Sequence, residues 1–148
     1  MVLRVAAETG CRVSDVLGLT VEKLRTAEKN GGQVFVLESK TGKSRRVYIN
    51  KELRKEMVQR INKFSPFVFP NRLDYTRPRT RQAVWKDLNR AAKALRVQGQ
   101  LSPHSFRKYA AKDKFKKTGK IDEVQKWLRH TDKAVTSVYL LAEEVTIR

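Results

Sequence analysis

The sequence lacks several features that would place it in other classes of protein. Its one cysteine, Cys11, excludes a disulfide within the chain and a zinc site built from several cysteines. It holds no apolar run of membrane-spanning length and no signal peptide. Acidic residues are few, with 15 Asp and Glu against 33 Lys and Arg. We therefore expect a protein of a reducing cytoplasm that has no membrane partner.

The basic excess is the first positive feature, and it gives a net charge of +18. Each phosphate that Lys or Arg neutralises releases condensed counterions, so a chain of this charge favours a polyanion as partner. Ribosomal proteins and membrane-surface binders are also basic, so charge alone leaves them open as alternatives. The charge is spread along the whole chain, which indicates a folded basic surface and not a basic tail.

The length of 148 residues suits one hydrophobic core, and 40% of the residues are hydrophobic. The N-terminal part predicts a helix over 1–9 that ends at Gly10, a short helix capped by Ser14, and strands over 33–38 and 46–49 around a turn at 40–43. Apolar periodicity then predicts helices over 51–63, 80–95, 121–128 and 132–141, and one that starts at Ser102 and Pro103. The expected fold is mainly α with a small antiparallel β-sheet (α+β), in which Trp85 and Trp127 are core anchors.

Residues that suit phosphate chemistry occur at the predicted turns and helix starts, and near the end of the chain. In chain order they are Arg12, Lys40, His104, Arg107, His130 and Tyr139. Two arginines can bind the non-bridging oxygens of a phosphate, a tyrosine can be the nucleophile, and lysine or histidine can move protons. The set therefore suits phosphoryl transfer without a metal ion or another cofactor.

Four segments resemble, in order, the conserved boxes of the tyrosine recombinase (phage integrase) family. They are Thr9-Gly10-Cys11-Arg12-Val13-Ser14-Asp15, the hairpin segment 39–47 with Lys40, Ser102-Pro103-His104-Ser105-Phe106-Arg107, and Leu128-Arg129-His130 with Tyr139 nine residues later. One such box is common by chance, but four in order across residues 9–139 are specific. The resemblance implies the catalytic-domain fold of that family and site-specific DNA recombination as the activity.

The resemblance also implies how the DNA strand is cut. Arg12 and Arg107 would clamp the scissile phosphate. Tyr139 would attack phosphorus, giving a 3′-phosphotyrosyl bond and a free 5′-hydroxyl. Lys40, favoured over Lys43, would protonate the departing 5′ oxygen.

Three further residues take supporting parts in this implied scheme. His104 would exchange a proton with the tyrosine hydroxyl, and His130 would hydrogen-bond the phosphate. Asp15 stands where the family has a carboxylate that supports the active site. No metal or nucleotide is required, because the phosphotyrosyl bond stores the energy of the broken phosphodiester for rejoining.

The sequence departs from the family's pattern at several points, two of which bear on the site and its domain. The separate N-terminal DNA-clamping domain has no counterpart, so we expect residues 1–148 to form a single catalytic domain that is shortened at its N-terminus. Arg129 stands where the family has a glycine before its histidine.

The implied partners are double-stranded DNA and further copies of the chain on paired DNA sites. The implied setting is the nucleoid in the cytoplasm of a prokaryotic cell, where a mobile element is integrated or excised. Further basic residues are candidates to follow the DNA backbone, with a solvated surface as the alternative: Lys43, Arg45, Arg77, Arg79, Arg81 and Lys86.

Other interpretations stay open from the sequence. Taken singly, each site residue has an ordinary role, and Tyr139 between two apolar neighbours is typical of a core aromatic. Tyr48, Tyr75 and Tyr109 are rival nucleophiles by composition. A non-catalytic DNA-binding integrase relative and a type IB topoisomerase are the alternative functions, and an RNA-binding role rests on charge alone. Covalent trapping through Tyr139 would separate the first from a recombinase, and plasmid relaxation by a monomer would favour the second.

Overall fold

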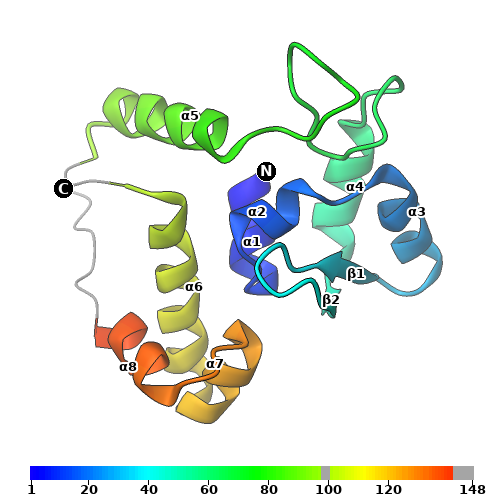
Figure 1. Ribbon diagram of the computed structural model, residues 1–148. Helices are drawn as coiled ribbons and strands as arrows, with labels where there is room; N and C mark the ends of the chain where they lie inside the picture. Colours follow the sequence, from blue (N-terminus) through cyan, green and yellow to red (C-terminus); the bar gives the residue numbers. More distant parts are fainter. Residues whose placement is uncertain (98–100, 142–148) are drawn as a thin grey trace.

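The computed structural model describes residues 1–97 and 101–141, without the side chains of Tyr139 and Leu141. Within these residues the chain forms helices and one two-stranded antiparallel sheet, which confirms the prediction of a mainly α fold with a small antiparallel sheet (Figure 1). In chain order the elements are α1 (Val2–Thr9), α2 (Val13–Leu17), α3 (Val21–Lys29), β1 (Gln33–Leu37), β2 (Ser44–Tyr48), α4 (Lys51–Gln59), α5 (Arg81–Ala94), α6 (Pro103–Thr118), α7 (Ile121–Leu128) and α8 (Lys133–Leu141).

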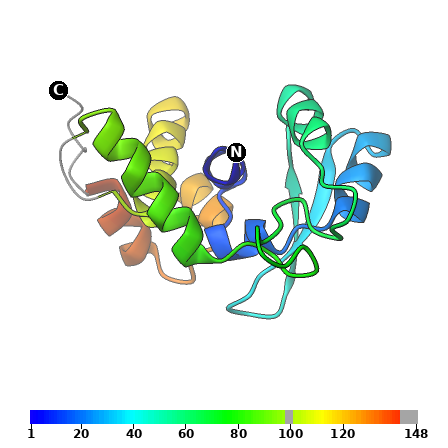
Figure 2. The ribbon, with the colours of Figure 1, turned by 90° about the horizontal axis from the view of Figure 1, so that it is seen from above.

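The elements pack around two hydrophobic cores. The larger core joins α1 to α4 and the inner face of the sheet, with Leu24 and Leu53 fully buried in it. The smaller core joins α6 and α7 through Ala111, Val124 and Leu128. Figure 2 shows α5 to α8 on one side of α1, and the sheet with α3 and α4 on the other. Since α1 packs against α2 and also against α6, it connects the two halves.

The β-hairpin alternates buried and exposed side chains along both strands, as expected for a sheet with one covered face. Val34 on β1 pairs with Val47 on β2, and both face the larger core. The pairing continues to Leu37 and Ser44, so β2 begins two residues before the predicted start at Arg46. The turn between the strands extends away from the helices (Figure 2).

The N-terminal half differs from the sequence prediction in two ways. Ser14 does not cap α2, because that helix begins at Val13 with the extended residue Arg12 as its N-cap. The hydroxyl of Ser14 instead lies 3.4 Å from Asp15 Oδ1. The third helix, α3, was not predicted, although Thr20 caps it by accepting a hydrogen bond from the backbone N–H of Lys23 at 3.3 Å.

The later helices follow the prediction closely at α5, α6 and α7, and less closely at α4. The helix predicted over 51–63 ends at Gln59, because the backbone N–H of Arg60 turns to the carbonyl of Met57 and the chain leaves the helix axis. At the start of α6, Ser102 and Ser105 form a reciprocal capping box, with Pro103 in the first position. This start was predicted from the same residues.

The two tryptophans take different positions. Trp127 packs against the smaller core, as predicted. Trp85 was expected to be a core anchor, but it is 50% exposed on the outer face of α5 because Val84 and Leu88 already supply the buried face of that helix. No helix within the described residues combines the length and apolarity needed to cross a membrane.

Candidate active site

The corner between α1 and α2 positions Arg12. α1 ends at Gly10, whose φ of 67° is left-handed and suits glycine. A Cβ atom at Gly10 would lie 2.8 Å from the ring of Trp127, so the close approach of α7 also requires glycine here. The side chain of Arg12 is 25% exposed, and its Nη1 lies 3.9 Å from Asp15 Oδ2. The corner thus holds Arg12 half-buried beside a carboxylate.

Asp15 links this corner to the hairpin turn. It is 3% exposed, and its Oδ1 accepts hydrogen bonds from the backbone N–H of Ser39 at 2.9 Å and from the Ser39 hydroxyl at 2.7 Å. Lys40 follows directly, with its side chain exposed in the turn. The carboxylate therefore joins the segment of Arg12 to the segment of Lys40, which is a physical basis for the supporting role predicted for Asp15.

α6 carries His104 and Arg107 at its N-terminal end. Arg107 is 3% exposed, and its Nη2 donates to the carbonyl oxygen of Leu128 at 2.6 Å. That carbonyl belongs to the last residue of α7, where backbone acceptors lack partners within the helix. His104, one turn earlier, keeps much of its surface exposed. Arg107 consequently fixes the end of α7 against α6, beside His104.

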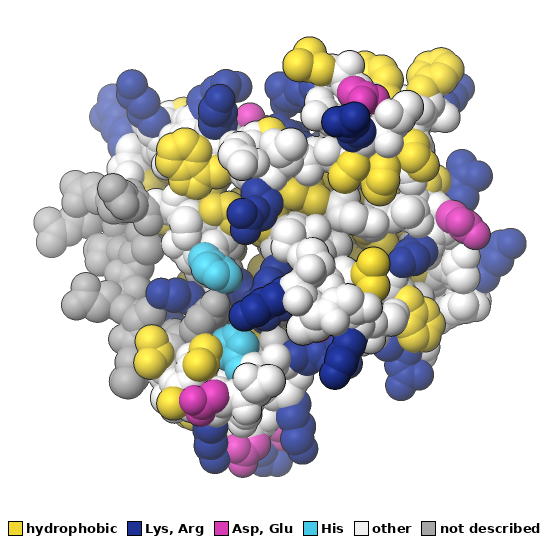
Figure 3. Space-filling model, in the orientation of Figure 1, with side chains coloured by type: hydrophobic (Ala, Val, Ile, Leu, Met, Phe, Trp, Pro, Cys, Tyr) yellow, Lys and Arg dark blue, Asp and Glu magenta, His cyan; other side chains and the backbone are white. Residues whose placement is uncertain are grey.

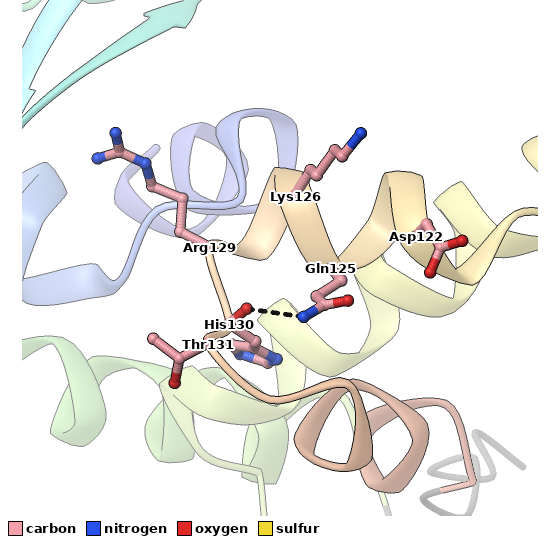
Figure 4. A pocket seen from close by; sticks show the side chains of 6 residues that line it. All are labelled: Asp122, Gln125, Lys126, Arg129, His130 and Thr131. Carbon is pink, nitrogen blue, oxygen red and sulfur yellow. Dashed lines mark hydrogen bonds between the residues drawn. The ribbon is translucent and has the colours of Figure 1, made fainter.

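His130 lies in the turn that follows α7. The backbone of Arg129 is left-handed, with φ 54°, and it reverses the chain so that the carbonyl of His130 accepts a hydrogen bond from Gln125 Nε2 at 3.1 Å (Figure 4). Nδ1 of His130 lies 3.1 Å from Oγ1 of Thr136, a buried residue of α8. The same turn borders a hollow of about 520 Å³ lined by Asp122, Gln125, Lys126, Arg129, His130 and Thr131.

Burial and the positive charges of Arg107 and Arg12 act on both histidines and lower their pKa values. Burial, followed by the charges of Arg107 and Arg12, lowers the pKa of His130 to about 4. Burial also lowers the pKa of His104, and the charges of Arg107, Lys108, Arg12 and Arg81 lower it further. Figure 3 shows the two histidines, the only cyan side chains, on one face with dark-blue Lys and Arg around them. The structure therefore brings Arg12, His104, Arg107 and His130 together.

For Tyr139, the predicted nucleophile, the structure describes the position of the backbone only. Residue 139 lies within α8, the helix that Thr136 connects to His130. The side chain of Tyr139 lies outside the described residues. Within those residues, no group of three or more His, Cys, Asp or Glu side chains is arranged to hold a metal ion.

Comparison with known proteins identifies the family of this chain. Residues 1–144 match the phage integrase family. The chain belongs to the phage integrase family. As a family member it is 27% identical over 139 residues to the probable integrase/recombinase YoeC of Bacillus subtilis, covering 93% of this chain and 74% of that protein. It is 29% identical over 142 residues to the tyrosine recombinase XerD of Shewanella oneidensis, covering 88% of this chain and 45% of XerD.

Solved structures share the fold of this integrase-family chain. XerA recombinase superposes with a TM-score of 0.74 at 20% identity, over 95% of this chain and 50% of XerA. A lambda integrase dimer bound to a COC' core site gives a TM-score of 0.70 at 19% identity, over 99% of this chain and 54% of that one. The predicted catalytic-domain fold of tyrosine recombinases is thereby confirmed. The chain spans about half the length of these structures and of XerD.

The basic residues proposed to follow DNA fall into two groups in this integrase-family chain. Lys43, Arg77, Arg81 and Lys86 are exposed. Arg45 does not fit the prediction, because it is 7% exposed and its guanidinium donates to the backbone carbonyls of Thr9, Gly10 and Trp127.

Arg79 also departs from the predicted role. It is half-buried at the start of α5, and its guanidinium forms an ion pair with Asp87. The sequence could not distinguish Arg45 and Arg79 from their exposed neighbours by residue type. For Arg45 the alternation of β2 was an available signal, since Arg45 and Val47 share the face that turns inward.

Proposed function

We propose that this chain is the catalytic part of a tyrosine recombinase that cleaves and rejoins double-stranded DNA through Tyr139. One observation carries the proposal beyond family membership: Arg12, His104, Arg107 and His130 come from three separate segments and converge on one another. The lowered pKa values of the two histidines leave them neutral, so the guanidinium groups of Arg12 and Arg107 are the positive charges gathered here, and their mutual repulsion raises the free energy of the unliganded protein. A bound phosphate would neutralise them, so the cluster suits an anionic substrate.

In the proposed reaction the phosphate lies between Arg12 and Arg107. Arg12 is partly exposed, and Asp15 holds it from one side. Arg107 is buried, and its hydrogen bond to the carbonyl of Leu128 fixes its guanidinium group at the end of α7. Two guanidinium groups in this arrangement stabilise the charge on the non-bridging oxygens of the pentacoordinate transition state.

The cleavage step forms a bond between Tyr139 Oη and phosphorus and breaks the bond from phosphorus to the 5′ oxygen. His104 accepts the phenolic proton, for which its lowered pKa is suited because the imidazole is neutral at neutral pH. The ammonium group of Lys40 gives a proton to the departing 5′ oxygen, and His130 hydrogen-bonds the phosphate. Rejoining reverses these transfers with the same side chains.

The partners and setting follow from the same proposal. The net charge of +18 supports binding to double-stranded DNA. Copies of the chain would associate on paired DNA sites, at the nucleoid in the cytoplasm of a prokaryotic cell, during integration or excision of a mobile element. The exposed residues Lys43, Arg77, Arg81 and Lys86 would contact the DNA backbone.

The test is covalent trapping on a nicked duplex, followed by denaturing electrophoresis. We expect a protein–DNA adduct from the wild-type chain and none from Tyr139→Phe, with DNA binding unchanged in the variant. Tyr109→Phe is the matched control, because Tyr109 is 69% exposed and lies on the same helix as Arg107. Adducts that persist in Tyr139→Phe would exclude this nucleophile.

Two other outcomes of the assay would point to the alternative functions. DNA binding without any adduct would favour a non-catalytic DNA-binding relative. Relaxation of plasmid by a monomer without site preference would favour a type IB topoisomerase.

A further inference from the structure

Arg129 adopts a backbone conformation that disfavours it. Its φ of 54° is left-handed, and a side chain with a Cβ atom is less stable there than glycine. Glycine at this position would serve the chain reversal after α7 equally well, since only the backbone makes the turn. The contacts of the Arg129 side chain are therefore the place to look for a reason why arginine occupies this position.

The side chain of Arg129 reaches the start of the hairpin turn. Its Nη1 lies 3.3 Å from Oε1 of Glu38, and the Glu38 side chain is only 5% exposed. This ion pair joins residues that are 91 positions apart, from the turn after α7 and from the end of β1. It is thus a tertiary connection between the turn that carries His130 and the turn that carries Lys40.

Glu38 is also the main anchor of the Lys40 turn. Its Oε2 accepts a hydrogen bond from the Thr41 hydroxyl at 2.8 Å. Its backbone carbonyl accepts from the N–H groups of Thr41 at 3.3 Å and Gly42 at 2.8 Å. On the other side of Lys40, both the N–H and the hydroxyl of Ser39 donate to Asp15. A buried carboxylate therefore holds the residue before Lys40, and another holds the residue after it.

The charge state of Glu38 is consistent with this arrangement. Burial alone would raise the pKa of its carboxyl group. Hydrogen bonds from Thr41 and Arg129 and the charges of Arg129 and Arg45 outweigh that effect, so the pKa lies below its ordinary value. Glu38 is consequently ionised at neutral pH, and the ion pair with Arg129 is present where the protein functions.

We propose that Glu38 and Arg129 form a positioning pair that holds the Lys40 turn against the His130 turn. The role of Lys40 as proton donor rests on the proposed function, whereas the contact between the turns does not. Holding the backbone on both sides restricts where the Lys40 ammonium can lie relative to the phosphate. The general acid then needs less reorganisation before each proton transfer.

The first test measures order in the turn without any DNA. Hydrogen exchange of the Thr41 and Gly42 amides should become about fivefold faster in Arg129→Gly and in Glu38→Gln, because the turn loses a partly buried ion pair. The matched control is Arg96→Gly. Arg96 has the same φ of 54° and is exposed. Within the described part of the chain, Arg96 makes no ion pair with a side chain.

The second test asks whether the pair serves proton donation. Cleavage of ordinary nicked DNA is compared with cleavage of DNA whose bridging 5′ oxygen at the scissile phosphate is replaced by sulfur. In the second substrate the phosphorus–sulfur bond breaks to a thiolate, which leaves without a proton. We expect Arg129→Gly to slow ordinary cleavage by about tenfold or more, part of what a general acid contributes, and to leave the sulfur substrate unaffected.

The cleavage rates of two further variants are compared with that of Arg129→Gly. Arg129→Lys keeps the charge and should restore most of the ordinary rate. Lys40→Ala should show the same selective defect as Arg129→Gly, in a stronger form.

The outcomes separate the inference from the proposed function. Unchanged amide exchange in Arg129→Gly would refute the positioning pair. Equal slowing on both substrates would refute its connection to proton donation. If the wild-type chain gives no adduct with either substrate, the proposed function fails, and amide exchange still decides whether the pair holds the turn.

Discussion

Replacing Gly10 with alanine is the sharpest test of how the site is assembled. Two structural facts act against a side chain at this position. The φ of 67° is left-handed, and a Cβ atom would lie 2.8 Å from two ring atoms of Trp127. The substitution therefore strains the corner that leads to Arg12 and pushes on the helix that leads to His130.

The expected cost can be divided into its two causes. The left-handed conformation costs an alanine about 1 kcal/mol relative to glycine. Forcing the Cβ atom against the ring adds about 1–3 kcal/mol, the usual range for overpacking. We therefore expect Gly10→Ala to lower the free energy of unfolding by about 2–4 kcal/mol.

Gly119 provides the matched control. It ends α6 with a φ of 66°, and a Cβ atom there would meet no other atom within 4 Å. Gly119→Ala should therefore cost only about 1 kcal/mol, which is the backbone cost alone. Urea unfolding followed by circular dichroism, with a linear extrapolation for each variant, gives both values.

Equal losses of unfolding free energy in the two alanine variants, within the error of about 0.5 kcal/mol, would show that the Trp127 ring does not oppose a side chain at Gly10. A double-mutant cycle locates the cause. Adding Trp127→Leu to Gly10→Ala should cost less than Trp127→Leu costs alone in the wild-type chain, because the smaller side chain relieves the contact. Additive losses would show that the ring does not resist the new methyl group.

Three further outcomes are expected. The ring of His130 should titrate near a pKa of about 4 in NMR spectra of the free chain. This pKa lies below the value of about 6.5 that histidine has in an unfolded chain. Neutral His130 therefore contributes its full stabilisation above a pH of about 6.5, and that stabilisation is lost as the pH falls towards the pKa of the folded protein. Bound DNA should raise the pKa by neutralising the nearby arginines, and a free-chain midpoint above about 6 would contradict the burial. Arg45→Met should lower the free energy of unfolding by about 2–4 kcal/mol, since it leaves three backbone carbonyls without their donor, and a loss under about 1 kcal/mol in urea titrations would contradict that. Affinity for duplex DNA in fluorescence anisotropy should fall by about a hundredfold or more between about 50 and 200 mM salt, and a flat response would exclude a phosphate-contacting surface.

Local chemistry explains which parts of the fold were predictable. The capping box of Ser102, the glycine at the end of α1 and the apolar period of α7 each act within a few residues, so the sequence shows them directly. α3 was missed because its buried face consists of Leu24 and Ala27 among polar neighbours, which is a weak periodic signal. The Thr20 cap alone does not predict a helix, because threonine caps turns as well as helices.

The site also contains a part that was predictable and a part that was not. Resemblance to a family selected Arg12, His104, Arg107 and His130, and the fold brings these four together. The links between segments were not predictable. Glu38 and Arg129 meet only because the fold brings the residue after β1 to the residue after α7. No local pattern reports a contact between residues so distant in sequence, and β-strand alternation indicates that Glu38 turns inward without naming its partner.

The buried guanidinium of Arg45 has a consequence for how the site attracts a phosphate. Its acceptors are the carbonyls of Thr9, Gly10 and Trp127, which are dipoles and carry no net charge. Within the described residues Arg45 makes no salt bridge, so the carbonyls stabilise its positive charge, and the nearby carboxylate of Glu38 offsets only part of it. Salt screens such an interior charge less than it screens surface lysines. Part of the attraction for DNA should therefore come from the interior of the protein and persist at ionic strengths that weaken the outer contacts.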